Sequence, residues 1–407
     1  MKRLQIWLII VISFSFLFGC AATVQSPRAR INSLGITDIS EGLPRDGLWR
    51  QTIALADMDG DGYLDIVAPP PRKAKQGQNM PHIFLWEKAG WKEGVFTFPS
   101  LEDYGYGGIA VGDINRDGYQ DIVLATHERR IIFLENDKNK GFVEKPFLVK
   151  DPFYSRMVAV SDINGDGWPD IIAFSESSFG ERSYKPKGIL AGINKEGNGW
   201  DVKTVEGTAG LFGDSMGIGD LKGNGNKDII IAPLIAKRKN IRLVWFGDGK
   251  GNFSAFDGDV IGGDVMSSLI TAGDLDGDGK DEVVFRISGF GTGAKTFLAA
   301  YKWTGAGVED ISKGLEAVRD PIVFDLADVD GHGKKELIVL STDGIHICKY
   351  ADTGWIERGY YELPSAETAG AYDLTVGRNR DGSLLIVYNL GDEGEGYQHG
   401  IRAYLLK

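Results

Sequence analysis

The chain has 407 residues, 43% of them apolar, with 57 acidic against 45 basic side chains. This length and apolar content suffice for one large or two ordinary globular domains. Nucleic-acid-binding proteins are usually basic, so the net charge of −12 argues against that class and we expect no nucleic-acid partner.

Residues 1–19 have the layout of a secretory signal peptide, with a basic start and an apolar run too short to span a bilayer comfortably. Leu17-Phe18-Gly19-Cys20 resembles the bacterial lipobox, in which the Cys is lipidated and becomes the first mature residue, although Phe18 replaces the usual small residue. A plain signal peptide with an incidental Cys is the alternative. We predict lipidation at Cys20 and a lipidated linker over residues 20–31.

The two residues after the lipobox, Ala21 and Ala22, bear on location. By resemblance to Gram-negative lipoproteins, the absence of Asp there favours the outer membrane, so we expect a protein attached to the cell envelope through Cys20. Cys348 is the only other cysteine, so a lipidated Cys20 leaves no intramolecular disulfide.

One motif recurs along the rest of the chain. It reads DMDGDGYLDIV from Asp57, and related copies begin at Asp113, Asp162, Asp220, Asp274 and Asp328, with a degraded copy at Gly377. Successive copies begin 49 to 58 residues apart, near the size of one four-stranded propeller blade.

Each copy predicts the same four strands in order. A short apolar stretch such as residues 53–56 precedes the loop, and a second strand such as residues 65–67 follows it. A third strand alternates apolar and polar residues, as in residues 130–135, and a fourth begins after a Gly and an aromatic residue, as at Gly141-Phe142. With no convincing helical period, the pattern predicts an all-β fold.

The two ends of the chain predict how the ring closes. The last copy lacks a fourth strand, whereas residues 35–43 closely match residues 307–315, the fourth strand of another blade. We therefore predict a seven-bladed β-propeller of four-stranded blades over residues 32–407, closed by an N-terminal strand that completes the last blade.

The loops have glycine-rich lead-ins, such as residues 104–108 and 211–213. With these lead-ins they resemble the FG-GAP or VCBS repeats of integrin-α-like β-propellers, over nearly all of residues 32–407. The resemblance implies a propeller that binds calcium, and suggests a role in adhesion or assembly.

The loops have the residue types of a calcium site. Side chains at positions 1, 3 and 5 and a carbonyl at position 7 can wrap one ion if a glycine at position 6 permits the turn, and here a carboxylate at position 9 closes the site. The first three loops lack the Glu that an EF-hand needs at position 12. The proposed ligands of the four fullest loops are Asp57, Asp59, Asp61, Tyr63 and Asp65; Asp113, Asn115, Asp117, Tyr119 and Asp121; Asp162, Asn164, Asp166, Trp168 and Asp170; and Asp274, Asp276, Asp278, Lys280 and Glu282.

Three loops are compromised. In the fourth, Lys222 replaces an oxygen ligand and leaves Asp220, Asn224 and Asp228. The sixth keeps Asp328, Asp330 and Glu336 but has His332 at position 5, and the seventh has lost both ends. Ordinary Asp-Gly hairpin turns are the alternative interpretation. We expect several structural Ca²⁺ ions that take no part in catalysis, because protein ligands fill their coordination.

Catalytic motifs are poorly supported. Residues 213–217, Gly-Asp-Ser-Met-Gly, fit the serine-hydrolase pattern but lead into the first strand of a blade, not into a helix. The five histidines show no paired zinc-binding spacing. We therefore predict no catalytic residues.

Aromatic and arginine residues gather where fourth strands return to the next first strand, opposite the calcium loops. Packing between blades and ligand binding are both open interpretations for them. A further residue, Asp325, stands where other copies have Ala, Gly or Thr, near the channel, and is either a hydrogen-bonded structural residue or a ligand site. The predicted face comprises Trp49, Arg50, Tyr104, Tyr106, Tyr154, Arg156, Phe212, Met266, Arg319 and Asp325.

Together these patterns predict a calcium-stabilised envelope lipoprotein that acts as a non-catalytic binding or adhesion module for a protein or glycan. A propeller-based polysaccharide lyase or hydrolase, and a scaffold of an envelope complex, are the alternatives.

Overall fold

The computed structural model describes residues 32–407 apart from 76–77, 102–103, 128, 139, 148–151, 178–183, 234–241, 259, 262–265, 290–294 and 306. The signal peptide, Cys20 and the linker therefore lie outside the described residues. No helix among the described residues is long and apolar enough to cross a membrane.

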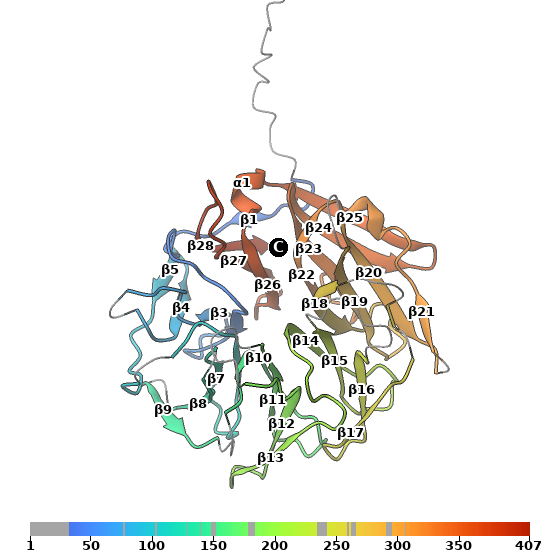
Figure 1. The fold of residues 1–407 in the computed structure, drawn as a ribbon. Helices are drawn as coiled ribbons and strands as arrows, with labels where there is room; N and C mark the ends of the chain where they lie inside the picture. The colour runs from blue at the N-terminus through green and yellow to red at the C-terminus, as the bar shows by residue number, and fades with distance from the viewer. Residues whose placement is uncertain are drawn as a thin grey trace, which may run out of the picture. The chain divides into compact units, whose positions relative to one another are not determined.

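The described strands form seven four-stranded antiparallel sheets arranged as the blades of a propeller (Figure 1). The first four blades, each from the innermost strand outward, are β2 (Ala54–Ala56), β3 (Asp65–Ala68), β4 (His82–Glu87) and β5 (Gly90–Glu93); β6 (Ile109–Gly112), β7 (Asp121–Ala125), β8 (Ile131–Asn136) and β9 (Phe142–Lys145); β10 (Ser155–Ser161), β11 (Asp170–Ser175), β12 (Ile189–Asn194) and β13 (Trp200–Thr204); and β14 (Gly213–Gly219), β15 (Asp228–Pro233), β16 (Val244–Gly247) and β17 (Phe253–Ala255).

The remaining blades follow the same order, with two short helical turns between strands. They are β18 (Met266–Gly273), β19 (Glu282–Ser288), β20 (Thr296–Trp303) and β21 (Val308–Asp310); β22 (Pro321–Ala327), β23 (Glu336–Ser341), β24 (Gly344–Ala351) and β25 (Gly354–Glu362); and β26 (Ala371–Arg378), β27 (Leu384–Leu390), β28 (Gly400–Leu406) and β1 (Thr37–Asp38). The turns are the 3₁₀ helix η1 (Leu315–Ala317) and α1 (Ser365–Thr368). The seven-bladed, all-β prediction is confirmed.

The last blade combines both ends of the described chain. β1 pairs antiparallel with β28, with Thr37 opposite Leu405 and Asp38 opposite Tyr404. Ser40 Oγ, just after β1, donates to the carbonyl of Ala403 at 3.1 Å. Without β1, the polar backbone edge of β28 would face solvent.

The core is divided among the contacts between successive blades. One cluster, for example, joins Val123 and Phe133 of the second blade to Ile171 and Leu190 of the third. The second strands are buried on both faces, as all five residues of β7 show, which explains their continuous apolar sequences. Each blade is thereby held by its neighbours.

The seventh motif is one residue shorter than the others. Gly377 pairs with Leu385, eight residues later, across the seventh motif. In the third loop Ser161 pairs with Asp170, nine residues later. In the strand register, Thr375 therefore takes the place that Asp325 holds in the sixth blade.

Candidate functional site: the loop face and the central channel

The motif loops of the first six blades have a common hydrogen-bonded conformation. In the first loop, Asp57 accepts the N–H groups of Gly60 (2.7 Å) and Gly62 (2.9 Å), and Asp61 accepts that of Tyr63 (2.8 Å). The bond from the position-6 glycine to the first Asp recurs in all six loops. That glycine has φ between 82° and 90° each time, a conformation that other residues adopt only with strain.

A buried Asp closes each of the first four loops. Asp65 accepts one N–H from Met58 inside the loop (2.8 Å) and another from Trp86 on the third strand (2.9 Å). Asp121, Asp170 and Asp228 accept equivalent pairs of backbone groups. Each closing Asp therefore ties its loop to the next two strands.

Burial raises the pKa of Asp65 and Asp121 to about 7, and that of Asp170 and Asp228 to about 6, against the lowering effect of these hydrogen bonds. In the first loop, oxygen atoms of Asp57, Asp59 and Asp61 also lie within 4.8 Å of one another. Carboxylates this close repel one another unless a cation neutralises them. The donor set and its charge therefore fit a hard divalent cation such as calcium.

The fourth, fifth and sixth loops contain basic side chains. Lys222 of the fourth loop lies over the ring of Phe246, 3.5 Å from its centroid. Lys302 contacts the fifth loop, and Lys349 and Arg358 contact the sixth. The seventh loop instead braces the first, because Asn379 Oδ1 accepts the N–H of Leu64 at 3.0 Å.

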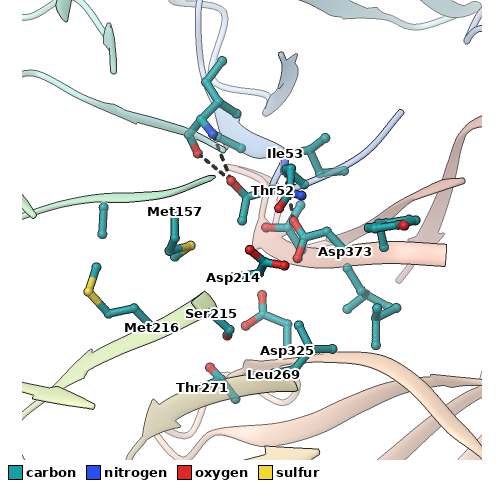
Figure 2. Close-up of a pocket in the computed structure, with 18 of the residues that line it drawn as sticks. Thr52, Ile53, Met157, Asp214, Ser215, Met216, Leu269, Thr271, Asp325 and Asp373 are labelled. Carbon is teal, nitrogen blue, oxygen red and sulfur yellow. Dashed lines mark hydrogen bonds between the residues drawn. The ribbon is translucent and has the colours of Figure 1, made fainter. Parts of the chain in front are cut away.

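The first strands of the blades surround a central channel of about 590 Å³. Asp214 of β14, Asp325 of β22 and Asp373 of β26 line it, and Figure 2 shows their carboxylates pointing toward a common space. Asp325 Oδ2 accepts the N–H of Val376 at 3.0 Å, and Asp373 Oδ2 accepts that of Ile53 at 2.9 Å. Two of the three acids thus also connect neighbouring blades.

The channel changes the acidity of these groups. Burial raises the pKa of Asp325 to about 6 and that of Asp373 to about 7, and the charge of Asp325 further raises the pKa of Asp373. The pKa of Asp214 is also raised by burial, although Arg156 opposes the rise. Both Asp325 and Asp373 remain partly accessible from the channel.

A cluster of charged groups lies at the channel mouth, at the blade ends opposite the motif loops. Arg156 Nε lies 2.7 Å from Glu176 Oε2, and one of its terminal nitrogens lies 3.5 Å from Asp214. His127 Nδ1 lies 2.6 Å from the same Glu176 oxygen. His127 also has a φ of 50°, which L residues rarely adopt and which often accompanies a functional site.

Aromatic rings extend this cluster around the mouth. Tyr106 packs on His127 with 4.6 Å between ring centroids, and the guanidinium of Arg72 lies over the Tyr106 ring, 5.8 Å from its centroid. Arg50 lies 4.7 Å from the ring centroid of Tyr372 and pairs with Asp392 at 3.2 Å. We call the channel mouth the set Arg50, Arg72, Tyr106, His127, Arg156, Glu176, Asp214, Tyr372 and Asp392.

The predicted ligand face is divided between the mouth and the core. Arg50, Tyr106 and Arg156 lie at the mouth, and Asp325 lies deeper in the channel. Trp49 and Tyr104 are only 5% and 2% exposed, so they pack in the core, which was the alternative interpretation. Tyr154 is stacked on Tyr184, Phe212 is half-buried, Arg319 is exposed, and the side chain of Met266 lies outside the described residues.

The sequence interpretation missed Glu176, His127, Tyr372 and Asp373. The first two follow second strands, where the repeats have no common motif, and the last two precede the shortened seventh loop. Asp214 was noticed only as part of the Gly-Asp-Ser-Met-Gly segment, which lies in β14. Its Ser215 Oγ accepts the N–H of Ile270 at 3.0 Å, so this serine has a structural partner.

A second serine has partners like those of a hydrolase. Ser341 Oγ lies 2.9 Å from His346 Nε2, and His346 Nδ1 lies 2.5 Å from Glu357. Ser341 is fully buried, however, and its hydroxyl also contacts Asp343. Because none of the described cavities is lined by Ser341, we assign this group a structural role.

Comparison with solved structures supports the fold. The crystal structures of BBS1N in complex with ARL6DN, soaked with mercury or with lead, match with TM-scores of 0.55 and 0.52 at 13% and 11% identity. Each match covers 93% of this chain and 97% of the other. The Dos1 propeller has a TM-score of 0.49 at 13% identity, covering 87% of this chain and 78% of that one.

Sequence comparison identifies the repeats. A search of curated proteins finds no match. The family model described as "FG-GAP-like repeat" matches residues 113–173 and 220–285, which include the second, third, fourth and fifth motif loops. The chain therefore contains FG-GAP-like repeats within a seven-bladed β-propeller.

Proposed function

We propose that this protein is an envelope lipoprotein whose propeller binds a protein or glycan partner at the channel mouth without catalysing a reaction. The observation that carries this proposal is the convergence of Asp214, Asp325 and Asp373 on a channel of about 590 Å³ with an arginine- and tyrosine-rich mouth. Calcium in the motif loops stabilises the opposite end of the blades.

The channel acids favour a ligand with a positively charged group. Among the described residues, no lysine or arginine forms an ion pair with Asp325 or Asp373. Leaving water costs a carboxylate several kcal/mol unless a cation or hydrogen bonds compensate. A lysine or arginine side chain, or an amino sugar, would supply that charge.

The mouth supplies the contact surface around this pocket. Tyr106 and Tyr372 offer large, rigid rings, and Arg50 and Arg156 are held in place by carboxylate partners. Tyrosine and arginine are the residue types that contribute most to binding in recognition patches. Because these side chains are already fixed, little conformational entropy is lost when a partner binds.

Calcium has a structural part in this proposal. The ligand sets that begin at Asp57, Asp113 and Asp162 hold oxygen donors at every side-chain position and contact no lysine among the described residues. A bound ion would neutralise the clustered carboxylates and fix the loops that connect first and second strands.

The lipid anchor at Cys20 places this binding surface at the cell envelope, and the residues after the lipobox favour the outer membrane of a Gram-negative bacterium. The prediction rests on the sequence of residues 17–22. Labelling cells with a radioactive or alkyne-bearing fatty acid should label the wild type, and Cys20→Ser should abolish the label.

Affinity isolation tests the proposed function. The tagged protein is purified from its own cells in calcium and in chelator, beside an Asp325→Asn/Asp373→Asn variant, and bound proteins and glycans are identified. We expect a partner that the variant loses and that chelation weakens. A partner retained by the variant would refute the channel site, whereas a partner retained equally in calcium and in chelator would favour a calcium-independent scaffold.

The raised pKa values of Asp325 and Asp373 give a polysaccharide lyase or hydrolase some support, because acid–base catalysis needs groups that titrate near neutral pH. Incubating the wild type and the Asp373→Asn variant with a panel of envelope and matrix polysaccharides tests this alternative. New reducing ends or unsaturated products formed by the wild type alone would favour the enzyme.

A further inference from the structure

The fifth and sixth motif loops differ from the first four in how they close. Their closing residue is Glu282 or Glu336 in place of Asp, and both side chains are buried to at least 99%. One oxygen of each, Glu282 Oε1 and Glu336 Oε2, accepts no hydrogen bond. In the first four loops the closing Asp accepts backbone N–H groups with both oxygens.

A lysine on the third strand faces each of these glutamates. Val283 pairs with Tyr301, so Lys302 stands beside Glu282; Leu337 pairs with Cys348, so Lys349 stands beside Glu336. In the first four blades, the third-strand residue that stands beside the closing Asp is identified from the same strand pairing. These residues are Leu85, Glu135, Ile193 and Phe246. Lysine thus occurs at this position in both Glu-closed blades and in none of the Asp-closed blades.

The lysine of the fifth blade reaches the predicted calcium ligands themselves. Lys302 Nζ contacts Asp276, lies 2.9 Å from Asp278 Oδ2 and lies 3.6 Å from Glu282 Oε1, the oxygen that accepts no hydrogen bond. Oxygens of Asp274, Asp276 and Glu282 lie within 4.8 Å of one another. The ammonium group therefore lies against the carboxylates that would otherwise surround a metal ion.

The sixth blade repeats the arrangement with different residues. Lys349 Nζ lies 3.3 Å from Asp330 and 3.7 Å from Glu336, and Arg358 lies 2.6 Å from Glu336. His332 of the same loop lies 2.8 Å from Asp330. Three basic side chains thus contact two predicted ligands.

We infer that Lys302 in the fifth loop, and Lys349 with Arg358 in the sixth, are built-in cations that replace calcium. A fixed ammonium beside the ligands repels a divalent ion and competes with it for the same oxygen atoms. Calcium is then confined to the earlier blades, and the fifth and sixth blades fold without it. This inference rests on the calcium part of the proposed function and departs from the expectation that the fifth loop holds an ion.

Native mass spectrometry of the mature protein, titrated with calcium, counts the ions bound by each variant. Asp59→Asn in the first loop should remove one ion, whereas Asp276→Asn in the fifth should leave the count unchanged. Lys302→Met should add one ion, and Lys302→Met/Asp276→Asn should lose that ion again. Lys280→Met is the matched control, since Lys280 lies 3.3 Å from Asp278 in the same loop but is more exposed; it should leave the count unchanged.

The outcomes separate the two proposals. Loss of an ion from Asp276→Asn with no gain from Lys302→Met would overturn the inference that Lys302 replaces calcium. It would leave the proposal of calcium binding intact. No loss from Asp59→Asn and no calcium bound by the wild type would refute the calcium proposal itself. Thermal melting gives a second readout. In chelator Lys302→Met should melt below the wild type, and calcium should remove this difference. A variant that melts like the wild type in both conditions would contradict the inference.

Discussion

Arg156 Nε lies 2.7 Å from Glu176 Oε2 at the channel mouth, where the Glu176 side chain is 2% exposed. The two residues come from the first strand of the third blade and from the end of its second strand. His127 of the second blade contacts the same oxygen, so the pair connects two blades.

Arg156→Met should therefore lower the melting temperature, because it leaves a buried carboxylate with one basic partner fewer; the loss should be about 3 kcal/mol. Thermal or urea unfolding measures it. Arg156→Met/Glu176→Gln should recover much of the loss, since the uncompensated charge is gone. A double variant as unstable as the single one would show that Arg156 contributes through packing instead.

The stability of the wild type should fall between about pH 4 and pH 7 as the channel acids ionise. Burial raises the folded-state pKa of Asp325 to about 6 and that of Asp373 to about 7, above the unfolded value of 3.8. The folded state thus binds protons that the unfolded state releases, so stability is lost as pH rises through this window.

The Asp325→Asn/Asp373→Asn variant should show a smaller loss of stability between about pH 4 and pH 7. Each raised pKa corresponds to on the order of 3 kcal/mol at the alkaline end. The two proteins are compared by how their free energy of unfolding changes with pH. The loss from weaker hydrogen bonds at asparagine does not depend on pH, so it cancels in this comparison. Equal pH slopes for the two proteins would contradict the assignment.

Calcium removal should destabilise the propeller. Each occupied site adds about 2.7 kcal/mol when free calcium exceeds its Kd by about 100-fold. Differential scanning calorimetry with calcium or chelator measures the effect, which Asp59→Asn should reduce. Asp381→Asn, in the degraded seventh loop, should leave it unchanged; a melting temperature insensitive to chelator would refute occupied sites.

Deleting residues 32–45 should give an aggregating or low-melting protein. The deletion removes β1 and the hydrogen bonds of Ser40, and it exposes the backbone edge of β28. Size-exclusion chromatography and thermal melting test this outcome. A synthetic peptide of residues 32–45 should restore the melt, and a monomeric deletion variant with an unchanged melt would show that closure does not depend on this strand.

The sequence predicted the blades and the loops because both depend on local patterns. The repeated Asp-x-Asp-x-Asp-Gly spacing marks the turn between first and second strands, and apolar runs mark the strands buried between blades. The position-6 glycine of each loop has a positive φ, which permits the sharp turn expected there.

The channel and the lysine contacts could not be predicted in this way because they depend on cross-strand register. Asp373 escaped notice because it lies two residues before Thr375, the residue that takes the place of Asp325 in the strand register. Lys302 is 20 residues from Glu282 along the chain, and only the pairing of β19 with β20 brings the two together. Glu176 and His127 likewise come from connections that the repeats do not share.

Site-specific photo-crosslinking in living cells tests most directly the claim that the channel mouth is the recognition surface. A photoreactive phenylalanine derivative replaces Tyr106 at the mouth or, as a matched aromatic control, Tyr119 on the loop face. We expect a discrete adduct with one partner from position 106 and none from position 119. An adduct from position 119 alone, or adducts from neither position, would contradict the account.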